Sequence, residues 1–146
     1  MNSALEEYFP FSTSSVAETV AFGRRLGEHL HPGDVVALHG DLGTGKTHLV
    51  KGVAATAGVE IDSVSSPTFS IVNEYPGTSH IVHFDLYRIK TNRELVELGF
   101  EEYLDRDAII ILEWPEMAHL FLPDNAIHIR IEHTGGDTRI FRLADS

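Results

Sequence analysis

The spacing of apolar residues near the start of the chain predicts an amphipathic helix. Between residues 16 and 30 apolar side chains recur at close to helical spacing, and Ser15 with Glu18 three positions later forms a capping box. The helix is expected to end near His31 and Pro32.

A buried strand is predicted next, because residues 35–38 form a short, branched apolar run. The glycine-rich segment 40–47 follows directly. Residues 47–57 return to helical spacing and stop at Gly58. The order is therefore strand, glycine loop, helix.

Two strand-like runs, 69–75 and 80–87, flank a turn at 76–79 and predict an antiparallel hairpin. Residues 94–103 have the pattern of a short helix interrupted at Gly99.

The most apolar run, 108–112, is predicted to be a central strand, and 126–133 with 138–143 predict a second hairpin around 134–137. No repeat or linker is visible. We therefore predict one α/β domain over residues 1–146.

Composition narrows the class of protein. With 22 acidic and 11 basic residues the formal charge is −11, which disfavours a broad basic face for nucleic acid. The absence of cysteine excludes disulfides and thiolate zinc sites. We see no signal peptide and no apolar run long enough for a membrane helix, so a cytoplasmic location is expected.

The segment GDLGTGKT at residues 40–47 fits the phosphate-binding pattern G-x-x-x-x-G-K-[ST]. Such a loop binds phosphate oxygens through backbone N–H groups at a helix start. Lys46 is expected to reach the β- and γ-phosphates, and the Thr47 hydroxyl to bind Mg²⁺. The predicted nucleotide contacts in this loop are Leu42, Gly43, Thr44, Gly45, Lys46 and Thr47.

A nucleotide site of this type also needs a carboxylate at the end of a neighbouring strand, and two residues compete for that role. Glu113 follows the apolar run and would lie at the carboxyl edge of a buried strand. Asp85 follows a strand of alternating polarity, which predicts a position nearer the sheet edge.

Other residues are open to several interpretations. Trp114, the only tryptophan, could stack on a base, anchor a partner or, as favoured here, pack in the core. Thr68 is by position an ordinary loop threonine. His80 and His83 point to opposite faces of an extended strand, so we assign no zinc site and expect surface or structural histidines.

Four motifs in order resemble the TsaE family: GDLGTGKT at 40–47, SPTF at 66–69, HFDLYR at 83–88 and EWP at 113–115. The resemblance covers nearly the whole chain and implies a P-loop NTPase fold, with a central mixed β-sheet flanked by helices. It also implies a weak ATPase required for threonylcarbamoyl modification of adenosine 37 in tRNAs that read codons beginning with A. Its implied partners are the proteins TsaB and TsaD.

Carried over residue by residue, the resemblance implies Lys46 as the phosphate lysine and Thr47 with Glu113 as Mg²⁺ ligands. It places switch-like positions at Thr68 and Asp85. The catalytic set is then Lys46, Asp85 and Glu113, the nucleotide set includes Thr68 and Trp114, and the cofactors are ATP and Mg²⁺. Residues 13–15 are a hypothesis for the adenine contact, and His48 departs from the family's usual Thr or Ser.

Two rival functions remain open from the sequence. A small P-loop phosphotransferase, such as a nucleoside or metabolite kinase, would need a lid, for which only the short acidic span 88–106 is available. A nucleotide-gated binding module with negligible hydrolysis would use the same loop to change its affinity for a partner.

Overall fold

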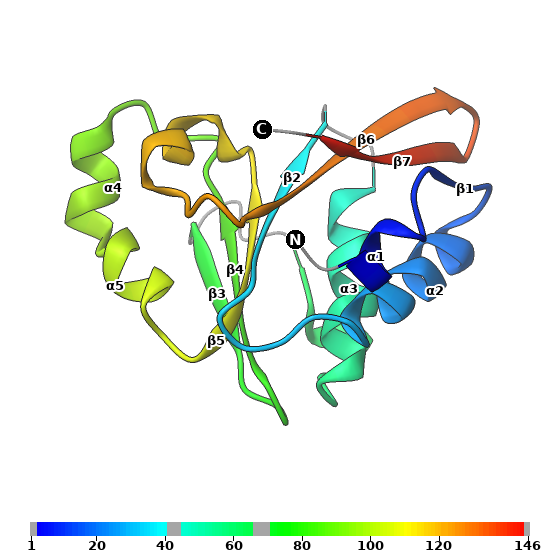
Figure 1. Cartoon of the computed structure of the whole chain (residues 1–146), viewed down its shortest axis with the longest axis horizontal. Coiled ribbons are helices and arrows are strands. Elements are labelled where there is room, and N and C mark those ends of the chain that lie inside the picture. Colours follow the sequence, from blue (N-terminus) through cyan, green and yellow to red (C-terminus); the bar gives the residue numbers. More distant parts are fainter. Residues whose placement is uncertain (1–2, 41–44, 66–70, 145–146) are drawn as a thin grey trace.

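The computed structural model describes residues 3–40, 45–65 and 71–144, and in these ranges one mixed sheet runs through the middle of the protein (Figure 1). The strands are β1 (Phe11–Thr13), β2 (Val35–His39), β3 (Val72–Tyr75), β4 (His80–Asp85), β5 (Ala108–Glu113), β6 (Ile127–Gly135) and β7 (Thr138–Ala144). The α-helices are α1 (Ser3–Glu6), α2 (Val16–Gly27), α3 (Lys46–Thr56), α4 (Asn92–Leu98) and α5 (Phe100–Leu104), and the 3₁₀ helices are η1 (Ile61–Ser63) and η2 (Pro115–Phe121).

The strand order is β1-β7-β6-β2-β5-β4-β3. β2 pairs in parallel with β5 and β6, and β5 pairs in parallel with β4. β3, β7 and β1 add antiparallel pairs toward the two edges. This confirms the predicted mixed sheet, both predicted hairpins and the interior position of the strand at 108–112.

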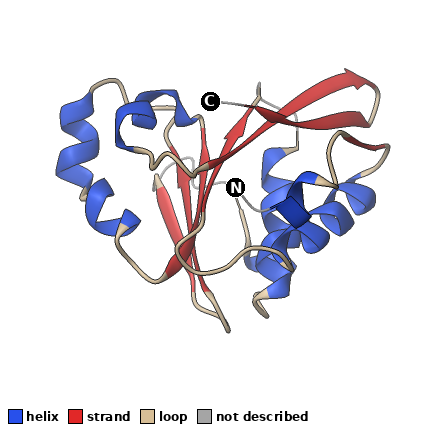
Figure 2. Cartoon of the chain, in the orientation of Figure 1, coloured by secondary structure: helices blue, strands red, loops and turns tan. Residues whose placement is uncertain are grey.

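Helices cover both faces of the sheet, as Figure 2 shows. On one face α2 and α3 pack Phe22 and Val50 against Ile111 in an apolar cluster. On the other face Leu95 of α4 and Phe100 of α5 are buried in a second cluster with Phe84 of β4. The prediction of a sheet flanked by helices is confirmed.

Helix α2 ends at Gly27, four residues before the predicted end near His31. After Glu28, two residues close i→i−3 turns: His29 N–H donates to Leu26 O, and Leu30 N–H donates to Gly27 O. Leu30 is nevertheless buried in the core. Its apolar character extended the periodic pattern beyond the helix itself.

Two other local predictions are confirmed. The Ser15 side chain accepts a hydrogen bond from Glu18 N–H at the start of α2. Gly99 adopts a φ of 80° and separates α4 from α5, as the interruption in the pattern indicated.

Helices α2 and α3 approach each other through glycine. A Cβ atom at Gly52 would lie 2.1 Å from Val20 O, and one at Gly23 would lie 2.3 Å from Leu49 O. These distances leave no room for a methyl group, so the spacing of the two helices depends on glycine at the contact. The contact positions α3, whose first residue is Lys46.

No helix within the described ranges combines the length and apolar character needed to cross a bilayer.

Candidate functional site

Of the predicted ligands that the structure describes, Asp85 and Glu113 lie at the carboxyl ends of parallel strands, and Lys46 and Thr47 lie at the start of α3. β2 runs into Gly40, and α3 begins at Lys46, directly after Gly45. Gly45 has a φ of 93°, a conformation that favours glycine, and it is the N-cap of the helix. The predicted strand before the glycine-rich segment and the predicted helix after it are confirmed. The predicted ligands Leu42, Gly43, Thr44 and Thr68 lie outside the described residues.

Lys46 places a buried ammonium group at this edge of the sheet. The residue is 4% exposed, and its Nζ donates a hydrogen bond of 2.7 Å to the Gly40 carbonyl. The same nitrogen lies 3.9 Å from the centroid of the Trp114 ring. Phosphate oxygens are stronger partners for an ammonium group than either a carbonyl or an aromatic face. The arrangement therefore suits anion binding.

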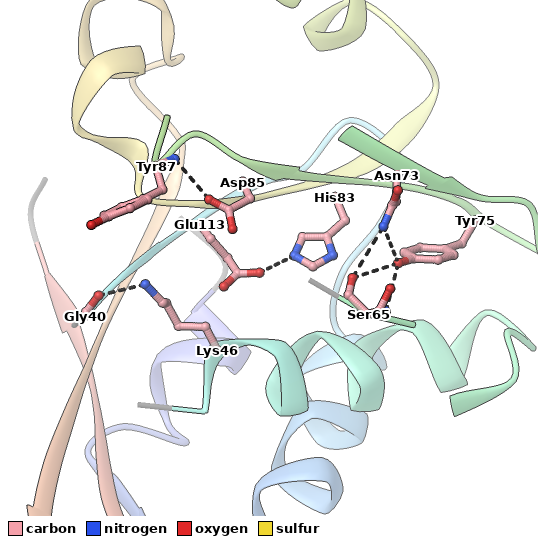
Figure 3. A network of polar contacts seen from close by, with 9 residues as sticks. All are labelled: Gly40, Lys46, Ser65, Asn73, Tyr75, His83, Asp85, Tyr87 and Glu113. Atoms are coloured by element: carbon pink, nitrogen blue, oxygen red, sulfur yellow. Dashed lines mark hydrogen bonds and ion pairs between the residues drawn. The ribbon is translucent and has the colours of Figure 1, made fainter. Parts of the chain in front are cut away.

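The register of β4 and β5 places Asp85 beside Glu113. Both carboxyl groups are buried. In Figure 3 the Lys46 side chain rises from the start of α3 toward these two residues. Two acidic groups and one basic group from separate parts of the chain thus face a common space.

Each carboxylate has a hydrogen-bond donor of its own. Asp85 Oδ1 accepts a bond of 3.0 Å from Tyr87 N–H, which fixes the turn after β4. Glu113 Oε2 lies 2.5 Å from Nε2 of His83, a fully buried side chain (Figure 3). The prediction that β4 lies nearer the edge is confirmed, since among the described strands only β3 lies beyond it. After His80, however, the residues of β4 are buried on both faces of the sheet.

His83 is a site residue that the sequence analysis missed. His80 and His83 were expected to point to opposite faces of the strand. In agreement, His80 bonds to Glu74, whereas His83 bonds to Glu113. The available signal was the spacing of His83 and Asp85, because residues two apart on a strand share a face.

Trp114 is not a core residue, so the favoured interpretation of core packing was wrong. It is half-buried, and its ring centroid lies 4.9 Å from that of Tyr87 as well as against Lys46. Its backbone has a φ of 56°, in the left-handed region, where the chain turns from β5 into η2. The tight turn after Glu113 directs the indole ring toward the lysine instead of the core.

The donor set suits a magnesium ion held together with nucleotide phosphates. Thr47 lies in the first turn of α3, and with Glu113 and Asp85 it offers the hard oxygen ligands that Mg²⁺ prefers. Within the described residues no three His, Asp or Glu side chains are arranged to hold a metal alone. Mg²⁺ commonly takes one or two protein oxygens and completes its shell with phosphate and water.

Histidines add to the electrostatics around α3. Burial lowers the pKa of His48, and Lys51 and Arg139 lower it further. Its Nδ1 is buried and has no hydrogen-bond partner among the described residues. A neutral imidazole is thus present at the position where the resemblance implies a hydroxyl.

A polar pocket of about 310 Å³ is lined by residues of β2, η2 and β6. Its wall includes His39 and His128, whose Nε2 and Nδ1 atoms are 2.9 Å apart. Burial lowers the pKa of His39 to about 4, and His128, Arg130 and Lys46 act in the same direction. His39 therefore stays neutral near Lys46 at physiological pH.

The proposed adenine contact at residues 13–15 is not tested by this geometry. The Thr13 hydroxyl is buried and lies 2.8 Å from that of Thr19, and Ser15 caps α2. Two of the three hydroxyl groups in that segment thus already have partners.

Comparison with known proteins gives a consistent result. A family model described as "Threonylcarbamoyl adenosine biosynthesis protein TsaE" matches residues 13–141. The tRNA threonylcarbamoyladenosine biosynthesis protein TsaE of Bacillus subtilis is 37% identical over 128 residues, which cover 87% of this chain and 79% of the relative. The protein of the same name from Rickettsia conorii is 36% identical over 128 residues, covering 87% and 73%.

The fold is also found in a solved structure. The crystal structure of Bacillus subtilis YdiB superposes with a TM-score of 0.76 and 31% sequence identity. The match covers 94% of this chain and 86% of that one. The α/β architecture described above is therefore shared along almost the whole length of both chains.

Proposed function

This chain belongs to the TsaE family and serves threonylcarbamoyladenosine biosynthesis in tRNA, and from that premise we propose that it binds ATP with Mg²⁺ and hydrolyses it weakly. The observation that carries the proposal is the arrangement of Lys46, Asp85 and Glu113 beside a sequence that fits a phosphate loop. We further propose that hydrolysis supports modification of adenosine 37 in tRNAs reading codons that begin with A.

The basic and the acidic side chains of the site have different proposed roles. Lys46 would exchange its contacts with Gly40 and Trp114 for oxygens of the β- and γ-phosphates. Thr47 and Glu113 would hold Mg²⁺, which when bound neutralises charge on the phosphates. Asp85 would orient the attacking water beside Glu113, and the buried setting of both carboxylates strengthens these interactions.

The chain is proposed to act through the proteins TsaB and TsaD and not on tRNA directly. A net charge of −11 opposes binding to a polyphosphate backbone. The proposal includes weak hydrolysis by the isolated chain and faster hydrolysis with its partners, because groups that stabilise the transition state can be supplied in trans. The family provides the partner assignment, and the charge agrees with it.

The kinase alternative loses support from the fold. The span 88–106, the one candidate for a substrate lid, forms α4 and α5. Leu95 and Phe100 from these helices are buried in the second apolar cluster. A segment that contributes to the core is not free to open and close over a second substrate.

The proposal is tested by calorimetric titration of ATP with and without Mg²⁺. We expect binding to the wild-type protein to strengthen with Mg²⁺ and to be lost in Lys46→Ala. Lys51→Ala is the matched control, because it removes a positive charge from the same helix at a position five residues later. Equal affinities for wild type and Lys46→Ala would refute the proposal.

Partner dependence needs a second assay. Phosphate release should rise when TsaB and TsaD are added together, and ATP should favour their co-purification with this chain. Transfer of labelled phosphate to a nucleoside or metabolite would support the kinase instead.

A further inference from the structure

His83 lies one pleat deeper in the sheet than the two carboxylates. On β4 it is two residues before Asp85, so both side chains project from the same face. It is 0% exposed, and its Nε2 is 2.5 Å from Glu113 Oε2. Figure 3 shows its ring between Glu113 and the side of Tyr75. The ring therefore supports Glu113 from inside the protein.

The second ring nitrogen determines the direction of this hydrogen bond. Nδ1 of His83 is buried and has no hydrogen-bond partner in the described part of the chain. A proton on Nδ1 would be a buried donor with no acceptor among the described residues, which is unfavourable. The proton is therefore placed on Nε2, which donates to the Glu113 carboxylate.

This bond occupies one oxygen of Glu113 and leaves the other available. A glutamate side chain has three rotatable bonds, and an unrestrained carboxylate would lose that freedom each time it bound a ligand. The N–H group of His83, which reaches Glu113 from inside the protein, limits the orientations of the carboxylate before nucleotide binds. Asp85 is held separately, because its Oδ1 accepts a hydrogen bond from Tyr87 N–H.

We propose that His83 is a positioning residue of the nucleotide site, which holds Glu113 Oε2 so that Oε1 faces the bound magnesium and phosphates. The proposal rests on the proposed function, since it assigns His83 a role through Glu113. It distinguishes His83 from a core histidine, because a core residue would affect stability without affecting the magnesium dependence of ATP binding.

The wild-type protein provides the first test. In ¹⁵N NMR of the histidine rings, His83 should carry its proton on Nε2, with a strongly low-field proton signal. That signal should move when Mg²⁺ is added to the ATP-bound protein. A proton on Nδ1, or a signal that does not respond to Mg²⁺ in protein that binds Mg²⁺ and ATP, would overturn the proposal.

Two variants of similar length provide the second test. His83→Gln keeps an N–H donor near the position of Nε2, and His83→Met removes it. We expect Mg²⁺-dependent ATP affinity to fall by about 10- to 100-fold in His83→Met, as for other outer-shell partners of metal ligands, and to be largely restored in His83→Gln. Folding of both variants is checked by thermal unfolding.

A double-mutant cycle with Glu113 completes the design. If His83 acts through the carboxylate, His83→Met should have little further effect on Mg²⁺ dependence in a Glu113→Gln background. Additive losses, or wild-type Mg²⁺ dependence in a folded His83→Met variant, would refute the positioning role. If the wild-type protein shows no Mg²⁺-dependent ATP binding, the proposed function fails instead, so the two failures can be distinguished.

Discussion

The ammonium nitrogen of Lys46 lies 3.9 Å from the centre of the Trp114 ring, so the lysine of the phosphate loop contacts the only tryptophan of the chain. A cation over an indole face is attracted by the ring's quadrupole, with an energy of about 0.5 to 2 kcal/mol. The contact links the predicted phosphate site to a natural fluorophore.

Binding of ATP with Mg²⁺ should therefore change the fluorescence of Trp114, because Lys46 leaves the ring for phosphate. Fluorescence titration checks this directly. Lys46→Ala should give no nucleotide-dependent change, whereas Lys51→Ala should respond as the wild type does. Unchanged emission in a sample whose ATP binding is demonstrated by calorimetry would contradict the proposed movement of Lys46.

Glu113→Gln should preserve the ATP binding that does not depend on Mg²⁺, lose most of the Mg²⁺-dependent gain in affinity and reduce turnover by about 10²-fold or more, because it removes the charge while keeping the shape. The amide oxygen still accepts the hydrogen bond from His83, so the fold should be little affected. Phosphate release in the presence of the partner proteins is the measurement. Unaltered release would refute the role of Glu113.

Asp85 permits a comparison between charge and structure. Asp85→Asn keeps an oxygen that accepts from Tyr87 N–H, whereas Asp85→Ala loses it. We expect both variants to lose turnover but only Asp85→Ala to lose stability, by about 1 to 3 kcal/mol for an unsatisfied buried donor. Urea unfolding measured beside phosphate release separates the two effects, and normal turnover in Asp85→Asn would contradict a catalytic role.

Gly52→Ala should destabilise the protein, although alanine is the better helix former. The added Cβ would lie 2.1 Å from Val20 O and 2.8 Å from Arg24 N, so α2 and α3 must move apart. Such overpacking costs about 1 to 3 kcal/mol or more. Denaturant unfolding gives the value.

Ala17→Gly, at an exposed position in α2, is the control for helix propensity. Because alanine is intrinsically favoured over glycine in a helix, Ala17→Gly should destabilise the protein by about 1 kcal/mol. If Gly52→Ala were to stabilise the protein, the close contact between α2 and α3 would be wrong.

His39 predicts a specific pH dependence of stability. Its folded-state pKa is about 4, below the unfolded value of 6.5. Between these values the unfolded chain binds a proton that the folded protein does not, so stability is complete above pH 6.5 and falls as the pH drops toward 4. The slope due to His39 is at most about 1.4 kcal/mol per pH unit.

Replacement of His39 by Gln should flatten this part of the curve of unfolding free energy against pH. His31→Gln, which alters an exposed histidine, should leave the slope as it is. An equal acid slope in wild type and His39→Gln would show that the buried pair with His128 does not control this loss of stability.

Much of the fold was predictable because its signals are local. Apolar periodicity located α3 and β5, the turn at 76–79 indicated one hairpin, and Gly99 marked the break between α4 and α5. Each of these features depends on residues within about ten positions of one another. The same holds for Lys46 and Glu113, because each belongs to a short motif at one end of an element. Lys46 begins α3 and Glu113 ends β5.

Contacts between distant segments were not predictable in this way. Trp114 was expected in the core because its size and its apolar neighbours favour burial, but the left-handed backbone after Glu113 turns it toward Lys46. His83 was treated as a surface or structural residue, because nothing near it in the sequence shows that β4 pairs with β5.

The sequence by itself determined the order of elements and the phosphate-binding motif, because hydrophobic spacing and glycine conformations act over a few residues. The tertiary structure alone decided that β5 lies between β2 and β4, that the Glu113 carboxylate is hydrogen-bonded to His83, and that the Lys46 ammonium group lies over the Trp114 ring. Those relationships depend on strand order and register, which arise only when segments tens of residues apart bury their apolar faces together.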